Sequence, residues 1–428
     1  MVLSGTIVVA QSSRAMVSST LNVKDIFGNW NPIQNKKFEI GLSLDSSIQN
    51  KVDSFFTTQT GINPYDPDQI KLVAKLTNLS NNVIYERYGF YYRNFTSQNN
   101  VWIEQPTNEH YRIRFTPPNS GAYQIDVLLY ISGNLIGSFN RQFTVNSGTE
   151  KGSLHLASAH RNKLQFENGD IFFGIGQNIP GPIGGNKPVC QSQWNCITHE
   201  SYEDQRAYLN DLANNGGNFT RLILNAWAYP VEWIYTPFLT TDPPASKPNS
   251  FYLTNYDVNQ RFMWELDKTF DVLEERDIYA ILCLLQDQNF SIQAGYDPLD
   301  LYEWKNNPYS GLLGNNIGGL KSFFTDATAK DKYKKFLFYI IARWGYSKNI
   351  ATWQLVNETI NLSNLDAPPL PSNGFFVNDQ IFRSNVIGWL CEMKGFLDSY
   401  YPLHPVNTGA GSTNNQPPSS NFSDIACM

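Results

Sequence analysis

The sequence predicts a multidomain protein in which an antiparallel β-sandwich precedes an α/β domain of the (β/α)8 class, the TIM barrel, that is incomplete at its C-terminal end. In the first part of the chain, apolar and polar residues alternate. Further along, strand-like apolar runs alternate with amphipathic helices, and long loops follow the strands. We expect an N-terminal extension over residues 1–34, an immunoglobulin-like sandwich over residues 35–148, and barrel strands one to six over residues 149–428. A doubly wound sheet would fit the same alternation.

The composition excludes several classes of protein. The 428 residues carry a formal net charge of −6, and 16% of them are charged while 14% are aromatic. This balance argues against binding of nucleic acid and against disorder. No apolar run reaches the roughly 18 residues of a membrane-spanning helix. We therefore expect a globular, monomeric chain.

Neither the cysteines nor the N-terminal segment indicates the cellular compartment of the protein. No cysteines are paired closely around histidines, so we expect no structural zinc site. Cys190 and Cys196 flank a polar loop and would suit either a disulfide or two free thiols. The segment from Met1 to Arg14 lacks the basic region and the cleavage site of a signal peptide.

Alternation with period two predicts half-buried antiparallel strands in the sandwich. The alternating apolar residues are Phe38, Ile40, Leu42 and Leu44; Ile70, Leu72, Ala74 and Leu76; Tyr111, Ile113 and Phe115; and Tyr123, Ile125, Val127 and Leu129. Segments rich in Gly, Pro, Asn and Ser separate these runs and supply turns.

The second domain has the pattern of an α/β fold. Apolar residues recur every three to four positions around 262–273, 336–344 and 386–397, which predicts amphipathic helices. The predicted strands are Ile171–Gly176, Phe219–Leu224, Tyr279–Leu285, Thr352–Val356, Pro405–Thr408 and Asp424–Met428.

A glycine-rich segment after the first of these strands superficially suggests a dinucleotide site. Gly174 and Gly176 have the right spacing, but Ile179 stands where the third glycine should be, and prolines follow where the phosphate-binding helix should begin. The signature motifs of serine hydrolases, zinc proteases and phosphate-loop proteins are also missing from the sequence. We therefore expect no nucleotide cofactor.

The most informative segment is a strand that ends in Asn357 and Glu358. At the C-terminal end of a barrel strand, such a pair points at substrate. Glycosidic cleavage needs a proton donor, and a Glu in a partly apolar cleft can keep its proton near neutral pH. A neighbouring Asn can bind a sugar hydroxyl. By itself the pair would equally suit a helix N-cap.

Other residues near the strand ends fit the same chemistry. Arg221, on the second strand, could keep a catalytic carboxylate ionised, although a surface ion pair would use it equally well. Polar groups after the first and third strands, including Asn178 and Asp287, could bind hydroxyls or simply belong to polar loops. Three tryptophans could stack on sugars or lie in the core: Trp227, Trp233 and Trp353.

Taken together, these segments resemble a family. The run from Tyr339 to Glu358, with Asn218 to Arg221, is similar to the cellulase- and mannanase-like barrels of glycoside hydrolase clan A. A branch of this clan that carries an N-terminal sandwich resembles the chain more closely. The motifs that carry this closer resemblance are Phe172–Asn178, Asn255-Tyr256, Trp264–Asp267, Asn63–Pro67, Gly89–Tyr92 and Arg114–Pro117, with Gly121. The three motifs from the sandwich, Asn63–Pro67, Gly89–Tyr92 and Arg114–Pro117 with Gly121, are similar to a domain of unknown function that often precedes such barrels.

The resemblance implies a retaining glycoside hydrolase that acts on a carbohydrate without a metal or cofactor. It assigns the acid/base role to Glu358. Asn357 and Arg221 match the positions that, in this clan, bind a substrate hydroxyl and support the nucleophile. The family's nucleophile is a second Glu after a seventh strand, which has no counterpart up to Met428. Since retention needs two carboxylates about 5 Å apart, we expect this chain to be a fragment that is inactive alone.

Two other functions stay open from the sequence. A carbohydrate-binding or adhesion protein could have kept the cleft of a glycosidase and lost its chemistry. A (β/α)8 lyase or isomerase would need a Lys or a metal-ligand set at the strand ends, and the sequence shows neither there. From the family habit and the low charge, we expect a secreted, periplasmic or cell-surface protein.

Overall fold

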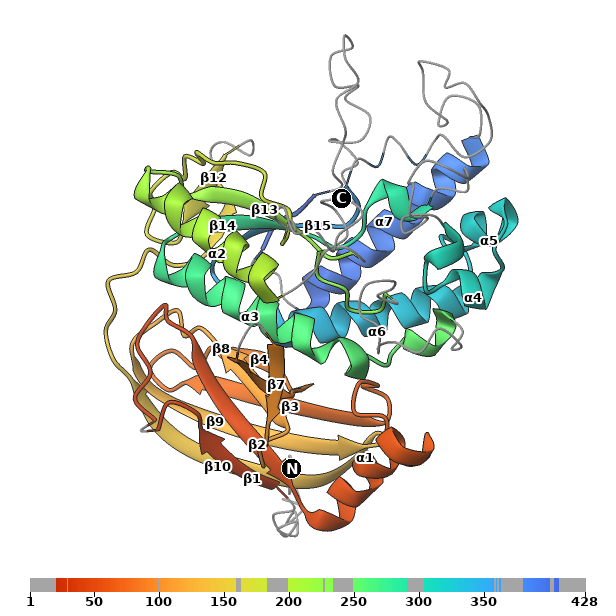
Figure 1. The fold of residues 1–428 in the computed structure, drawn as a ribbon. Coiled ribbons are helices and arrows are strands. Elements are labelled where there is room, and N and C mark those ends of the chain that lie inside the picture. Colours follow the sequence, from red (N-terminus) through yellow and green to blue (C-terminus); the bar gives the residue numbers. More distant parts are fainter. Residues whose placement is uncertain are drawn as a thin grey trace, which may run out of the picture.

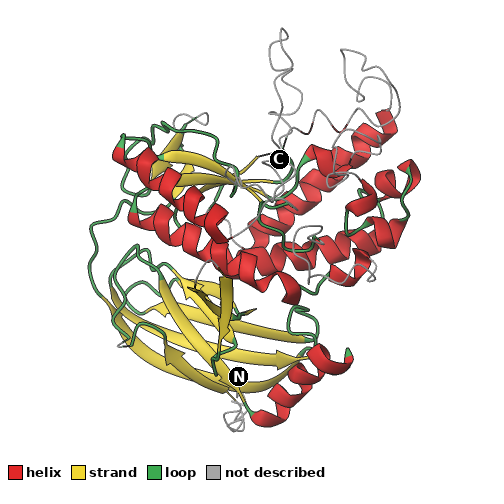
Figure 2. Ribbon diagram, viewed as in Figure 1, coloured by secondary structure: helices red, strands yellow, loops and turns green. Residues whose placement is uncertain are grey.

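The computed structural model describes residues 21–28, 30–98, 101–158, 163–182, 199–225, 228–233, 249–290, 304–357, 359, 362, 380–400 and 404–407. A β-sandwich forms one lobe, helices lie over it, and a parallel sheet lies on the far side of these helices (Figures 1 and 2). Buried apolar residues from both lobes belong to one continuous core.

The sandwich consists of two antiparallel four-stranded sheets. In the order of pairing, the strands are β1 (Leu21–Asp25), β2 (Phe38–Leu44), β8 (Tyr111–Phe115) and β5 (Phe90–Tyr91) in one sheet, and β10 (Asn134–Val145), β9 (Gly121–Ile131), β3 (Ile70–Asn78) and β4 (Ile84–Tyr88) in the other. All four strands that the alternation predicts are present. Strand β1 lies inside the segment 1–34, which therefore contributes an edge strand to the sheet and is not wholly an extension.

Burial along β9 follows the predicted period. Its alternate residues Tyr123, Ile125, Val127 and Leu129 are buried, while their neighbours are partly exposed. Aromatic rings fill the space between the two sheets, as in the pairs Phe38–Phe143 and Phe115–Tyr123, whose centroids are 5.3 and 6.2 Å apart. The alternation thus predicted the inward face correctly.

Two elements of this lobe have no counterpart among the predicted strands. Helix α1 (Ser46–Thr58) begins at Asp45, whose side chain accepts a hydrogen bond from Ser47 N at 2.8 Å. It buries Ile48 and Val52 against the sandwich. The hairpin of β6 (Asn94–Gln98) and β7 (Val101–Gln105) extends towards the helices, where Trp102 Nε1 donates to Glu265 Oε1 at 2.7 Å.

The second lobe contains the parallel sheet and its helices. The strands, in order, are β13 (Phe219–Ile223), β14 (Tyr279–Cys283), β15 (Ile350–Gln354) and β16 (Val406–Asn407). The longer helices are α2 (His199–Asn214), α3 (Gln260–Glu275), α6 (Ala327–Trp344) and α7 (Gln380–Tyr400). The short strands are β11 (Leu154–Leu156) and β12 (Leu164–Phe166), and the short helices are α4 (Ser310–Leu313) and α5 (Ile317–Ser322). The 3-10 turns are η1 (Asn249–Tyr252), η2 (Asp257–Asn259), η3 (Asp287–Phe290) and η4 (Trp304–Asn306).

The predicted strands and helices of the α/β domain are present in part. Four of the six predicted strands pair in parallel in the expected order, and the three predicted helices are α3, α6 and α7. The segment Ile171–Gly176 is not a regular strand, but Gly176 forms a parallel bridge with Phe219 at the start of β13. The predicted strand Asp424–Met428 lies outside the described residues. Within the described part of the chain the sheet is open, so a closed (β/α)8 barrel and the boundary at residue 148 stay predictions.

A buried ion-pair cluster joins the two lobes. Strand β8 is buried on both faces, and Arg114 points away from the sandwich core towards helix α3. There Arg114 Nη1 and Nη2 donate to Asp267 Oδ1 and Oδ2 at 2.7 and 3.1 Å, while Arg114 Nε donates to Glu39. From α6, Arg343 Nη2 donates to Asp267 Oδ2 and Trp344 Nε1 to Oδ1, both at 2.8 Å.

The arginines decide the charge of Asp267. Burial alone would raise the pKa of this carboxyl, but Arg114 and Arg343 outweigh burial and hold the pKa well below its usual range. Asp267 is therefore ionised, and its negative charge lies between two buried guanidinium groups.

The segment Asn63–Pro67 adds a second set of contacts between the lobes. Asn63 Nδ2 donates to the Thr254 carbonyl at 2.7 Å, and the Tyr65 hydroxyl donates to Asp257 at 3.2 Å. Asp66 accepts from Lys335 of α6 at 2.9 Å. This turn therefore also fixes the sandwich against the helices.

Replacing Asp267 by Asn should destabilise the whole protein. The change leaves two buried guanidinium groups facing a neutral amide, and breaking a buried ion pair typically costs about 3–5 kcal/mol. Urea denaturation would measure the loss in free energy of unfolding. The matched control is Asp398→Asn in α7, where the carboxylate pairs with Lys394 at a side-chain exposure of 40%, so its cost should stay below about 1 kcal/mol. Equal losses in the two variants would contradict the role of the cluster.

Candidate functional site

Three polar side chains from different segments meet on the face of the parallel sheet that is turned away from the helices. Arg221 of β13 is at their centre. Its Nη1 donates to Asn357 Oδ1 at 2.6 Å, and its Nε donates to Asn178 Oδ1 at 3.1 Å. Arg221, Ile281 and Thr352 occupy one row of the sheet and are partly exposed, whereas the next row, Leu222, Leu282 and Trp353, is buried in the core.

Hydrogen bonds from side chains of β13 and the residue before it to the neighbouring backbone place Asn178 beside β13. The Asn218 side chain accepts from Ile175 N at 2.8 Å and donates to the Phe173 carbonyl at 3.1 Å. Further along, Thr220 Oγ1 donates to the Gln177 carbonyl at 3.0 Å. Gly176 is required here because a Cβ atom at this position would lie 1.6 Å from the Phe219 carbonyl oxygen. The glycine-rich segment therefore serves close packing on β13.

The end of the β15 segment places Asn357. Its backbone N donates to the Leu285 carbonyl at 2.8 Å, and it forms a parallel bridge with Gln286. Gln286 accepts in turn from Asn225 Nδ2 at 2.7 Å. Because an arginine side chain only donates, the oxygen of the Asn357 amide must face Arg221. Its NH₂ group is then oriented to donate to another acceptor, such as a hydroxyl.

A hollow of about 340 Å³ lies against these residues. Gly176, Gln177, Asn178, Phe219, Thr220, Arg221 and Ile281 line it. Arg221, Asn178 and Asn357, which the sequence analysis singled out separately, are thus brought together by hydrogen bonds. The arrangement offers fixed donors and acceptors to a polar ligand, with an apolar patch from Phe219 and Ile281.

Two of the predicted residues, Glu358 and Trp227, lie outside the described residues. Glu358 follows Asn357 directly in the sequence. Its role as acid/base stays a prediction, and so does a stacking role for Trp227. The suggested Cys190–Cys196 disulfide also lies outside the described residues.

The burial of two other tryptophans weighs against the suggested stacking role. Trp353 is 1% exposed, lies on the sheet face opposite to Arg221, and packs edge-on against His404 at 6.1 Å between ring centroids. Trp233 is 6% exposed. Both side chains are thus largely enclosed by protein, which favours the core interpretation over the stacking role. Their apolar character is equally suited to either role, so the sequence could not distinguish them.

Asp287 follows β14 at the C-terminal end of the parallel sheet and begins η3. It is buried at 9% exposure, next to the Gln286 that bridges to Asn357. Its role as a substrate ligand stays a prediction.

Sequence reasoning missed a buried acid near this sheet end. Glu232 is 4% exposed, and its Oε2 accepts from the Tyr309 hydroxyl at 3.2 Å. Burial raises the pKa of Glu232 to about 8, against the lowering effects of the Thr254 backbone, Tyr309 and Lys332. The folded protein therefore holds this acid protonated at neutral pH. Its flanking residues Val231 and Trp233 are apolar, which was the available signal.

Glu232 should make stability fall as the pH rises. The ordinary pKa of this carboxyl is 4.5, and in the folded protein it is about 8. Between these two pH values, the folded protein keeps the Glu232 proton that the unfolded chain releases. The contribution of Glu232 to the free energy of unfolding is therefore fully present below pH 4.5. It is lost as the pH rises from 4.5 to about 8, by up to about 5 kcal/mol. Glu232→Gln should remove this part of the slope in urea denaturation between pH 5 and 9, whereas Glu104→Gln on exposed β7 should not. An unchanged slope in Glu232→Gln would refute the assignment.

Three further observations bear on the class of protein. Within the part of the chain that the structure describes, no group of three or more His, Cys, Asp and Glu side chains could hold a metal ion. Among the same residues, no helix has both the length and the apolar character needed to cross a membrane. Cys391 is disulfide-bonded, and Cys283 is a buried free thiol.

Comparison with known proteins gives only distant similarities. No family model and no curated protein sequence matches the chain. Among solved structures, a candidate glycoside hydrolase from Bacteroides vulgatus is 16% identical with a TM-score of 0.47, over 90% of this chain and 57% of that one. A β-1,4-D-mannanase from Cryptopygus antarcticus is 13% identical with a TM-score of 0.39, over 61% and 63% of the two chains. A β-mannanase from the blue mussel Mytilus edulis is 13% identical with a TM-score of 0.34, over 64% and 68%. This chain spans less than two thirds of the first two structures.

Proposed function

We propose that this protein is a retaining glycoside hydrolase that cleaves β-glycosidic bonds of a polysaccharide or oligosaccharide. The observation that carries the proposal is the 2.6 Å hydrogen bond from Arg221 to Asn357 on the open face of the parallel sheet. It joins the middle of β13 to the segment that follows β15, at the position directly before Glu358. The sequence motifs that resemble clan A glycoside hydrolases support the same function.

In the proposed reaction, Glu358 donates a proton to the leaving oxygen and later accepts one from the attacking water. The amide of Asn357, whose oxygen is turned towards Arg221, would donate to a hydroxyl of the sugar. The guanidinium group of Arg221 would also favour the ionised form of a neighbouring nucleophile. The resemblance expects that nucleophile to be a second Glu on a seventh strand. No metal or cofactor has a step in this mechanism.

The proposal includes an extracytoplasmic location. The disulfide at Cys391 supports it, because structural disulfides persist mainly in oxidising compartments. Secreted, periplasmic and cell-surface placement all agree with this feature.

The decisive test is Glu358→Gln in the purified protein, assayed for reducing ends on a panel of β-linked polysaccharides. Removing a general acid/base should lower kcat by about 10²–10⁴-fold, with an unchanged melting temperature. Glu104→Gln, on the exposed hairpin strand β7, is the matched control and should keep wild-type rates. A Glu358→Gln enzyme with near-wild-type rates would refute the assignment.

The same assay tests a non-catalytic sugar-binding protein as the alternative. Saturable sugar binding by the wild type without turnover of any linkage would favour that function. The burial of Trp233 and Trp353 weighs against it, because it removes two of the three predicted aromatic platforms.

A further inference from the structure

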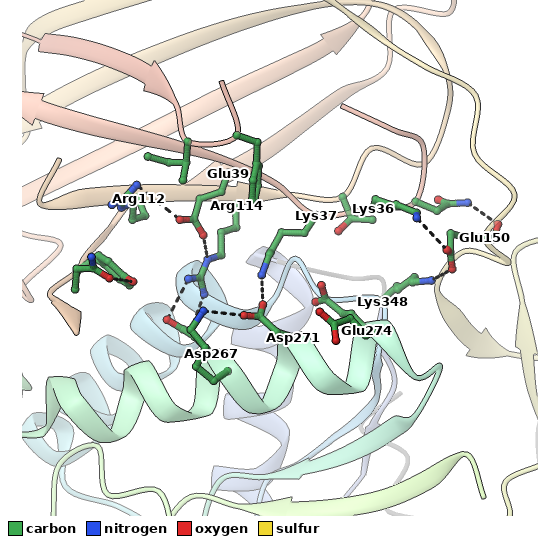
Figure 3. A pocket seen from close by; sticks show the side chains of 18 residues that line it. Lys36, Lys37, Glu39, Arg112, Arg114, Glu150, Asp267, Asp271, Glu274 and Lys348 are labelled. Carbon is green, nitrogen blue, oxygen red and sulfur yellow. Dashed lines mark hydrogen bonds and ion pairs between the residues drawn. The ribbon is translucent and has the colours of Figure 1, made fainter. Parts of the chain in front are cut away.

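A cavity of about 600 Å³ lies between the sandwich and helix α3. Figure 3 shows its two walls. The sandwich contributes cations, among them Lys37, Arg112 and Arg114, and α3 contributes carboxylates, among them Asp267 and Asp271. None of the residues that line the hollow at Arg221 lines this cavity. Ligand sites of this size are common at the interface between two lobes.

Most of the cavity's cations are neutralised by close partners. Arg114 bonds Glu39 and Asp267, and Lys37 donates to Asp271. At the end of the cavity that Figure 3 shows farthest from Arg112, Lys348 donates to Glu150 Oε2 at 2.5 Å. These pairs account for the stability of the interface and leave little charge for a ligand.

Arg112 is less completely paired. It is 6% exposed and forms an ion pair with Glu39 (Figure 3), but its Nε and Nη1 atoms have no hydrogen-bond partner. The Glu39 Oε1 atom is 3.8 Å from Nη1, which is beyond hydrogen-bond distance, and Arg114 engages the other oxygen of Glu39. Buried polar groups without a partner are rare in folded proteins. Arg112, which lines the cavity, therefore has two buried donors whose hydrogen-bonding capacity is unused.

The surroundings hold this guanidinium group in place. It lies over the Tyr92 ring, with its Cζ atom 4.8 Å from the ring centroid. Gly41 lies opposite Arg112 in the strand register, and a Cβ atom there would come within 3.0 Å of Arg112 Nη1. The lack of a side chain at Gly41 thus leaves the room that the guanidinium occupies.

We propose that the cavity binds a small organic anion, whose carboxylate or phosphate group is held by Arg112. The planar fork of a guanidinium matches the oxygens of either group. Such a ligand would supply a hydrogen-bond partner to one of the two atoms Nε and Nη1, which lie on different edges of the guanidinium, and the remaining cavity volume would take its uncharged part. This site is independent of the proposed catalytic one.

Isothermal titration calorimetry of the purified protein tests the proposal, with glucuronate and inorganic phosphate as probes in a chloride buffer of matched ionic strength. We expect saturable 1:1 binding of at least one probe, and the tighter one identifies the anionic group. In Arg112→Met the affinity should fall by about tenfold or more, because a charge-assisted contact is lost. Arg112→Lys keeps the charge but not the fork and should bind with intermediate affinity.

Lys36→Met is the matched control at the cavity rim, where the side chain is 55% exposed. It should change the affinity by less than about twofold. In the wild type alone, the binding probe should also raise the melting temperature at constant ionic strength, a readout that does not depend on the folding of any variant. Absence of saturable binding and of this shift for both probes would overturn the proposal, and so would equal weakening in Arg112→Met and Lys36→Met.

Discussion

The arrangement of the two lobes depends on one ionised carboxylate, Asp267. A charge this deeply buried is stable only when paired, and its partners come from a sandwich strand and from a helix 76 residues further along the chain. Because the carboxylate accepts from Arg114 and Arg343 at once, it fixes β8, α3 and α6 relative to one another. The sheet that carries Arg221 packs on the other side of these helices (Figure 1).

Several of the motifs that carry the family resemblance lie at the interface between the lobes. Arg114, Asp267 and Arg343 form the ion cluster, and the Tyr339 hydroxyl donates to the Tyr91 carbonyl at 3.1 Å. Asn63 bonds the Thr254 carbonyl. Sequence reasoning treated these segments as turns, strands and helix faces, because local pattern contains no information on which distant charge a side chain will meet.

Much of the fold was predictable, since periodicity reports which face is buried. The strands around β9 and the helices α3, α6 and α7 follow from that rule alone. Helix α1 was missed because it is mostly polar and buries only a narrow stripe. At the site, Arg221 and Asn357 were predicted from strand ends, but their hydrogen bond and the burial of Trp353 depend on register, which the sequence does not reveal.

The burial of β8 on both faces restricts how the sandwich can be combined with other domains. One face of the strand completes the sandwich core, and the other presents two arginines to the helical layer. A sandwich transplanted without its helices would expose these guanidinium groups and the apolar surface around them. Any natural or engineered exchange of N-terminal modules must therefore carry the Arg114–Asp267 pairing with it, so the interface restricts which sandwiches can be shuffled onto this α/β scaffold.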